Sequence, residues 1–246
     1  MREEIDPNLK NEKPDFDSLL SDLFGLNVRG AKTLWDLFAR PKRVFESARV
    51  FDWRSRYTPT IRLAFSILTV FSLLSFFWAS EDGVLYQTLL AQFSDAFADD
   101  PNAPPIDEMI GAMFAGYNFT YPFAYMLVHM LAASILFVWG KGTPLVARIR
   151  LYFGVASVGI AFATLSVFAM PFLNPNLVLI SSGVGVALNL TAYGVVYTRG
   201  MRGEFTSFGL ISRAVLIALF ITIVDFAVAL LAGSVAGAWA NFHLGL

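Results

Sequence analysis

The chain has 246 residues, of which 56% are hydrophobic and 15% are charged, and its formal net charge at pH 7 is -1. This balance is typical of a chain dissolved in lipid and argues against an ordinary soluble domain. The chain contains no cysteine, which excludes disulfides, thiolate nucleophiles, zinc ribbons and iron–sulfur clusters.

Residues 1–57 are polar, and we expect them to form a cytoplasmic N-terminal segment. Within the acidic first part, apolar residues at helical spacing predict a short amphipathic helix from Asp15 to Leu26. The first long apolar run comes only after this segment and is too long for the core of a cleavable signal peptide. We therefore expect the first span to act as its own insertion signal.

Residues 31–57 are basic and predict two short amphipathic helices separated by Pro41. Their apolar stripes consist of Leu34, Trp35 and Phe38, and of Val44, Phe45, Ala48 and Phe51. Aromatic stripes opposite basic residues, directly before a span, predict a helix pair in the inner membrane interface that contacts anionic lipid headgroups. The residues expected at this interface are Trp35, Phe38, Arg40, Lys42, Arg43, Arg49 and Trp53. The alternative is a docking surface for a cytoplasmic partner.

Five apolar stretches in residues 58–240 predict a transmembrane domain. A spanning helix needs about 20 apolar residues, and a backbone in hydrocarbon must satisfy its own hydrogen bonds, so these stretches are expected to be helical. The predicted spans are approximately 59–78, 121–139, 151–171, 177–197 and 210–239. The predicted fold is thus all-α, a polytopic bundle of five transmembrane helices.

The distribution of Lys and Arg predicts the orientation. Eleven of the 18 precede Pro59, the loop 80–120 has none, and further cations lie in the second and fourth connections. The positive-inside rule then places the N-terminus in the cytoplasm and the C-terminus outside, which in a bacterial inner membrane is the periplasm. Aromatic residues at the predicted helix ends are expected in the headgroup layer: Trp78, Trp139, Tyr197 and Trp239.

The outer loop, residues 80–120, is longer than a simple connection requires. Apolar residues at helical spacing predict two short helices, Val84 to Phe97 and Ile106 to Phe119, separated by a turn-rich break. We expect this pair to fold over the outer end of the bundle. Its acidic residues lack the spacing and the central glycine of a calcium loop, so we expect no metal site there.

His129, Asn189 and Asp225 are strongly polar residues near the middle of the second, fourth and fifth predicted spans. An ionisable residue at that depth is costly and normally faces the bundle interior with a partner. The three residues therefore predict one buried polar cluster. It is a satisfied structural group, a proton or ion relay between Asp225 and His129, or a contact with a partner subunit. One carboxylate, an odd number of spans and no visible repeat favour the structural role.

Gly233 and Gly237 form a small-xxx-small motif near the outer end of the fifth span, where helix backbones can approach closely. We expect this motif to pack inside the bundle, with a dimer seam as the alternative.

Enzyme signatures such as a nucleophile elbow, a metalloprotease helix or a complete phosphate loop are not found in the sequence. We expect no enzymatic activity and no cofactor. The basic stretch lacks a nucleic-acid recognition motif, so lipid headgroups are the expected partner. The leading interpretation is a non-enzymatic accessory or scaffold protein that packs against a partner membrane complex or self-associates. The alternative is a small transporter, or an ion- or proton-conducting bundle, that uses the polar cluster.

Three sequence segments before the first span resemble the start of the bacterial DUF3667 family of unknown function: Thr33 to Pro41 (TLWDLFARP), Val44-Phe45, and Arg54 to Pro59 (RSRYTP). The order of the five spans, with a glycine-rich turn at 140–143, resembles the broader Yip1-like superfamily. That resemblance implies a small helical membrane protein whose eukaryotic relatives bind small GTPases and help membrane trafficking. Members of the bacterial family often begin with a cysteine zinc ribbon, which this chain lacks. No catalytic residue is implied.

Overall fold

The computed structural model describes residues 28–50, 53, 56–78, 83–97, 105–169 and 178–245, and every regular element in these ranges is an α-helix. The predicted all-α fold is therefore confirmed. The described helices are α2 (Val28–Ala39), α3 (Pro41–Val50), α4 (Thr60–Trp78), α5 (Val84–Ala96), α6 (Ile106–Ile135), α7 (Leu145–Ala169), α8 (Val178–Gly200) and α9 (Ser207–Leu244). The predicted helix from Asp15 to Leu26 lies outside the described residues.

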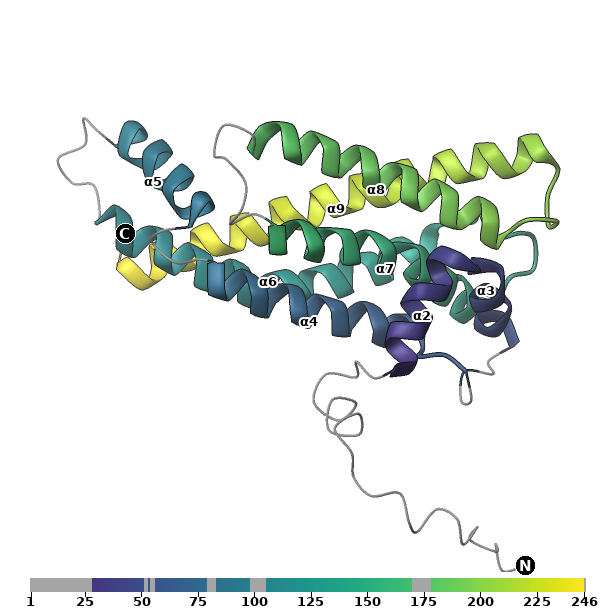
Figure 1. Ribbon diagram of the computed structural model, residues 1–246. Helices are drawn as coiled ribbons and strands as arrows, with labels where there is room; N and C mark the ends of the chain where they lie inside the picture. The colour runs from purple at the N-terminus through teal and green to yellow at the C-terminus, as the bar shows by residue number, and fades with distance from the viewer. Residues whose placement is uncertain are drawn as a thin grey trace, which may run out of the picture.

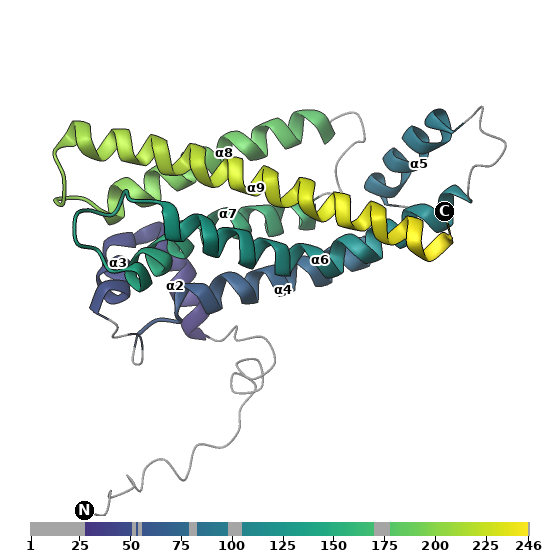
Figure 2. The same ribbon diagram turned by 180° about the vertical axis from the view of Figure 1, so that it is seen from behind.

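Five long helices, α4, α6, α7, α8 and α9, run along one another as an elongated bundle (Figures 1 and 2). The most extensive packing joins α6 to α9, α4 to α7, and α8 to α9. Helices α2 and α3 lie across one end of the bundle against α7 and α8, and α5 lies beside α6 at the opposite end. We call the α2–α3 pair the collar.

The first half of α7 is the centre of the bundle. All residues from Leu151 to Ala161 are buried, and α7 contacts α4, α6, α8 and both collar helices. A helix that is apolar on every side is stable only where neighbours cover every side. Ser157 fits this environment because its hydroxyl donates to the Phe153 carbonyl at 2.6 Å, within the same helix.

Local sequence signals shape one connection and the start of one helix. Gly140 and Gly142 have φ angles of +105° and +79°, a region that glycine enters without steric cost, so the connection between α6 and α7 turns sharply there. Thr206 precedes α9, and its hydroxyl oxygen accepts from the Gly209 amide. This bond satisfies one of the free amides of the first helical turn.

Phe45 anchors the collar to the bundle. Its side chain is buried and packs edge-to-face on Trp139, with ring centroids 6.2 Å apart. Gly200 of α8 provides the space, because a Cβ at that position would lie 2.5 Å from the Phe45 ring. The adjacent Arg199 donates to the last two carbonyls of α2 at 2.8 and 2.7 Å. These bonds satisfy carbonyls that the end of α2 otherwise leaves without a helical partner.

The apolar stretches predicted from the sequence lie mainly in the five long helices, but several boundaries differ. α6 ends at Ile135, before the predicted end at 139, and α9 extends beyond both predicted ends at 210 and 239. α7 begins at Leu145, before the predicted third stretch. α6 is continuous from Ile106 to Ile135, so the predicted separate helix Ile106 to Phe119 is wrong. The helix passes through Pro122, since one proline removes a single hydrogen bond and no further turn signal accompanies it. The predicted outer helix from Val84 agrees with α5.

By length and apolar composition, two of the described helices are able to cross a membrane: Leu145–Phe168 and Ser207–Leu244. α4 contributes a shorter apolar stretch, Thr60–Ser75. The collar, the α6–α7 connection and the α8–α9 connection all lie at the same end of the bundle (Figure 1). The described segments that carry most of the cations are therefore gathered at one end.

Two aromatic residues expected in the headgroup layer lie in the core instead. Trp139 and Tyr197 are buried, with ring centroids 5.4 Å apart. The Tyr197 hydroxyl donates to the Val138 carbonyl at 2.6 Å. The collar covers this end of the bundle, so rings that a bare helix end would leave at its surface become enclosed.

A buried hydrogen bond joins the collar to the segment that leads into α4. The Tyr57 hydroxyl donates to Asp36 Oδ2 at 2.9 Å, and both residues are buried. Burial, followed by the hydrogen bond to Asp36 and the charge of that residue, raises the pKa of Tyr57 above its usual value.

We expect Tyr57→Phe to destabilise the protein below about pH 10, because Asp36 loses its buried donor. The pKa of Tyr57 is higher in the folded protein than in the unfolded chain. Its contribution to the free energy of unfolding is therefore complete at pH values below the unfolded-state pKa, and it is lost as the pH rises through the folded-state pKa. Unfolding midpoints of the wild type and the variant, measured from about pH 8 to about pH 11, should therefore converge at high pH. A constant difference would contradict this assignment.

Candidate functional site

His129 lies at the centre of a polar cluster inside the bundle. It belongs to α6 and is fully buried. The ring of Tyr125, one turn earlier, is stacked on the imidazole with centroids 3.8 Å apart and an interplanar angle of 15°. The Nδ1 atom lies 2.9 Å from the Tyr152 hydroxyl of α7. One face and one nitrogen of the ring are thus occupied by tyrosines.

Asp225 of α9 occupies the other side of His129. Its Oδ1 lies 3.2 Å from His129 Nε2, a close contact that is not aligned as a hydrogen bond. Its Oδ2 accepts from the Tyr193 hydroxyl of α8 at 2.9 Å. The cluster therefore joins four helices, α6, α7, α8 and α9, through two ring nitrogens and two carboxylate oxygens.

The close approach of Tyr193 depends on Gly159 of α7. A Cβ at Gly159 would overlap the hydroxyl and ring atoms of Tyr193, whose side chain is buried. The absence of a side chain on α7 thus creates the space in which the Tyr193 hydroxyl reaches Asp225.

Of the three residues predicted to form the cluster, the structure brings His129 and Asp225 together. Asn189 lies on α8 one turn before Tyr193, and its Oδ1 is buried without a hydrogen-bond partner among the described residues. The same holds for the Tyr125 hydroxyl and for Thr222 Oγ1, which lies one turn before Asp225. Buried polar atoms are normally bonded to protein or water, so the surroundings of the cluster retain unused hydrogen-bonding capacity.

The tyrosines were not predicted from the sequence. Tyr125 stands four residues before His129, a spacing that places both side chains on one helix face. The contact between these two residues could therefore be predicted from the sequence. The parts played by Tyr152, Tyr193 and Gly159 depend on how the helices cross. No local pattern indicates them.

The residues predicted at the membrane interface occupy different environments. Trp35 is 70% exposed, whereas Trp53 is buried and Phe38 packs edge-to-face on Phe162 with centroids 5.5 Å apart. Arg49 bonds Glu204 at 2.8 Å. The three other predicted cations, Arg40, Lys42 and Arg43, are among the residues that line a cavity at the collar.

The second apolar stripe of the collar, predicted to face the membrane interface, faces the protein instead. Its described members Val44, Phe45 and Ala48 are buried, and α3 packs on α7 and α8. Phe51 lies outside the described residues. Packing against apolar helices removes the apolar surface of this stripe from water, as contact with lipid would.

Gly233 and Gly237 do not pack inside the bundle as predicted. A Cβ at either glycine would meet no heavy atom within 4 Å. The close contact of α9 with α6 is instead at Ala236, whose Cα would lie 3.2 Å from a Cβ on Gly116. Gly237 lies about 100° from Ala236 around the helix and Gly233 about 60°, and neither glycine makes a close contact at this seam.

We expect Gly159→Ala to destabilise the protein by about 1–3 kcal/mol, because the added methyl group forces the buried Tyr193 away from Asp225. Gly194→Ala is the matched control, since a Cβ there meets nothing within 4 Å and alanine favours helix. Thermal unfolding of the two variants in the same detergent is the measurement. Equal midpoints for both variants would contradict the proposed packing.

No protein-family model, no curated protein and no solved structure matches this chain. The resemblance to the bacterial family and to the Yip1-like superfamily therefore stays a prediction.

Proposed function

We propose that this chain is a five-span integral membrane protein, with its N-terminus in the cytoplasm, that acts as a non-enzymatic accessory or scaffold subunit. The proposal combines a membrane location, inferred from the surface of the bundle, with a structural role for the buried polar cluster.

The surface of α6 supports the membrane location. A row of large apolar side chains at four-residue intervals is exposed along the helix: Phe119 (74%), Phe123 (60%), Leu127 (64%), Leu131 (61%) and Ile135 (66%). At 1.5 Å per residue this row is about 24 Å long, comparable with the hydrocarbon core of a bilayer. Water-exposed apolar patches of this extent are rare on soluble monomers, and they mark membrane or protein contacts.

The surface of α9 leads to the same inference. Its exposed apolar residues extend from Phe208 near the start to Phe242 near the end. The gathering of the collar and the two cation-bearing connections at one end (Figure 1) supports the orientation expected from the positive-inside rule. An orientation of this kind leaves α5 and the C-terminal end of α9 on the outer side.

The contact between the buried His129 and Asp225 is the main observation that supports a structural role for the cluster. A transport group needs access to water from each side in turn, whereas His129 is fully buried between tyrosines. Both carboxylate oxygens of Asp225 have neighbours on other helices. Contacts of this kind, made between side chains of four helices, constrain how these helices pack, which suits a scaffold with a defined lateral surface.

The mass of the intact particle tests the accessory role. We expect that mild extraction into nanodiscs, followed by native mass determination, yields either a fixed-ratio complex with another membrane protein or a homo-oligomer. The open faces of α6 and α9 are the expected contact surfaces, so Leu127→Gln should weaken the assembly, whereas Lys141→Gln in the α6–α7 connection should not. A monomer in every preparation would overturn the proposal.

The second candidate is proton or ion conduction through the bundle. It is favoured by the partial exposure of the Asp225 side chain, 27%, and by the unused polar atoms beside it.

Asp225→Asn separates the two candidates, because the amide oxygen still accepts from Tyr193 but carries no charge. For a scaffold we expect the same native mass as the wild type and no change in proton flux across proteoliposomes. Loss of a wild-type flux would establish conduction. Complete loss of expression would contradict the expectation that the scaffold tolerates the replacement of Asp225 by an amide.

A further inference from the structure

We propose that the cavity between the collar and the end of α8 binds a phosphate group, as a doubly charged phosphomonoester or a diphosphate. The cavity has a volume of about 400 Å³. Its lining includes five cations, Arg40, Lys42, Arg43, Arg199 and Arg202, and one carboxylate, Glu46. This inference goes beyond the accessory role and does not depend on it.

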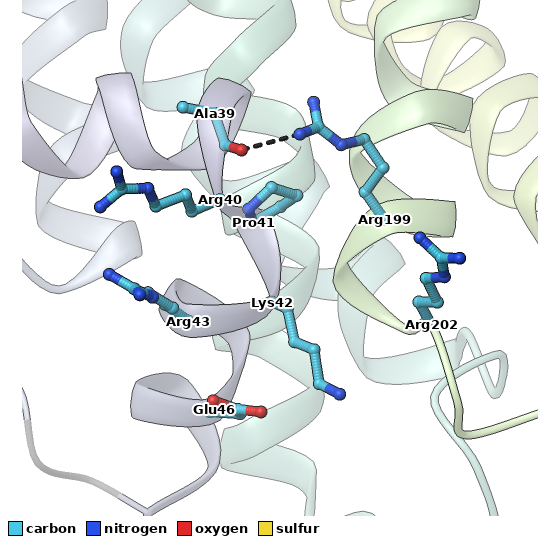
Figure 3. Close-up of a pocket in the computed structure, with 8 residues that line it drawn as sticks. All are labelled: Ala39, Arg40, Pro41, Lys42, Arg43, Glu46, Arg199 and Arg202. Carbon is cyan, nitrogen blue, oxygen red and sulfur yellow. Dashed lines mark hydrogen bonds between the residues drawn. The ribbon is translucent and has the colours of Figure 1, made fainter.

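Segments far apart in the sequence supply these cations. Figure 3 shows Lys42 extending from the first turn of α3 between the collar and α8, with Arg199 and Arg202 on the α8 side. Arg40 and Arg43 extend toward the other side of the collar, where they also line a neighbouring cavity with Lys32 and Arg56. Lys42, Arg199 and Arg202 carry the same charge on the walls of one cavity, and like charges repel one another, so an anion bound between them would be stabilised.

Two other cations at this end have partners within the fold. Arg49 is paired with Glu204, and Arg199 donates to carbonyls of α2. Among the described residues, the side chains of Lys42 and Arg202 have neither a hydrogen bond nor an ion pair. These two groups retain all their donors for a ligand, and lysine and arginine are the side chains that bind phosphate oxygens.

The start of α3 adds to the positive field. Its first turn contains no acidic residue, and Pro41 and Lys42 line the cavity. The N-terminal end of a helix carries a partial positive charge that acidic side chains or bound anions normally complement. Here cationic side chains stand at that positive end, and a phosphate would offset both charges at once.

The double variant Lys42→Gln/Arg202→Gln tests the site, with Lys141→Gln as a control at an exposed cation of the same end outside this cavity. Native mass spectrometry of the full chain in detergent measures retained phosphatidic acid against phosphatidylcholine. Calorimetry with inorganic pyrophosphate measures a soluble ligand. We expect the double variant to bind about 25-fold more weakly, at about fivefold for each cation removed, and the control to bind as the wild type.

The two ligands distinguish the source of the phosphate. Selective loss of phosphatidic acid, with no pyrophosphate binding by the wild type, assigns the site to a lipid headgroup, and this assignment also requires the proposed membrane orientation. Saturable pyrophosphate binding that the double variant loses assigns it to a soluble phosphate. Equal losses in the double variant and the control, or no loss in either, overturn the proposal. None of these outcomes depends on the native mass that tests the accessory role.

Discussion

The carboxylate of Asp225 imposes the main constraint on this bundle. It is the single acidic residue in the sequences of α7, α8 and α9, and an acidic group among apolar helices must find partners on its neighbours. Its oxygens contact His129 of α6 and Tyr193 of α8, and His129 in turn reaches α7 through Tyr152. Apolar surfaces alone tolerate sliding and rotation of helices. A polar contact with fixed partners selects one arrangement.

Steric fit supports that arrangement. Gly159 lets Tyr193 reach the carboxylate, and Gly200 lets Phe45 enter the other end of the bundle. In both cases a glycine on one helix receives an aromatic ring from another, so close packing and the position of a polar or aromatic group are specified together. A side chain at Gly159 or Gly200 would clash with the neighbouring ring, whereas a side chain at Gly233 or Gly237 would enter open space.

The polar cluster and the collar are suited to different tasks. The polar cluster has the fully buried His129 at its centre and bridges four helices, which suits a structural role. The collar lies at one end, is docked by Phe45 and Arg199, and carries cations on its outer side (Figure 3). A bundle held rigidly by its interior can present such a charged end to phosphate and its open apolar faces to lipid or to a second protein.

The sequence by itself determined the helical class, because apolar runs of this length can bury their backbones only as helices. It also determined the start of α9 at Thr206 and the turn at Gly140, and it indicated that His129 and Asp225 needed partners. The tertiary structure decided which partners these are. Tyr152 and Gly159 belong to α7 and Tyr193 belongs to α8. The way these helices cross α6 and α9 cannot be predicted from the sequence of any one segment. It also decided that Phe45 and Trp139 are buried by each other, because an amphipathic stripe specifies an apolar contact but not whether lipid or protein supplies it.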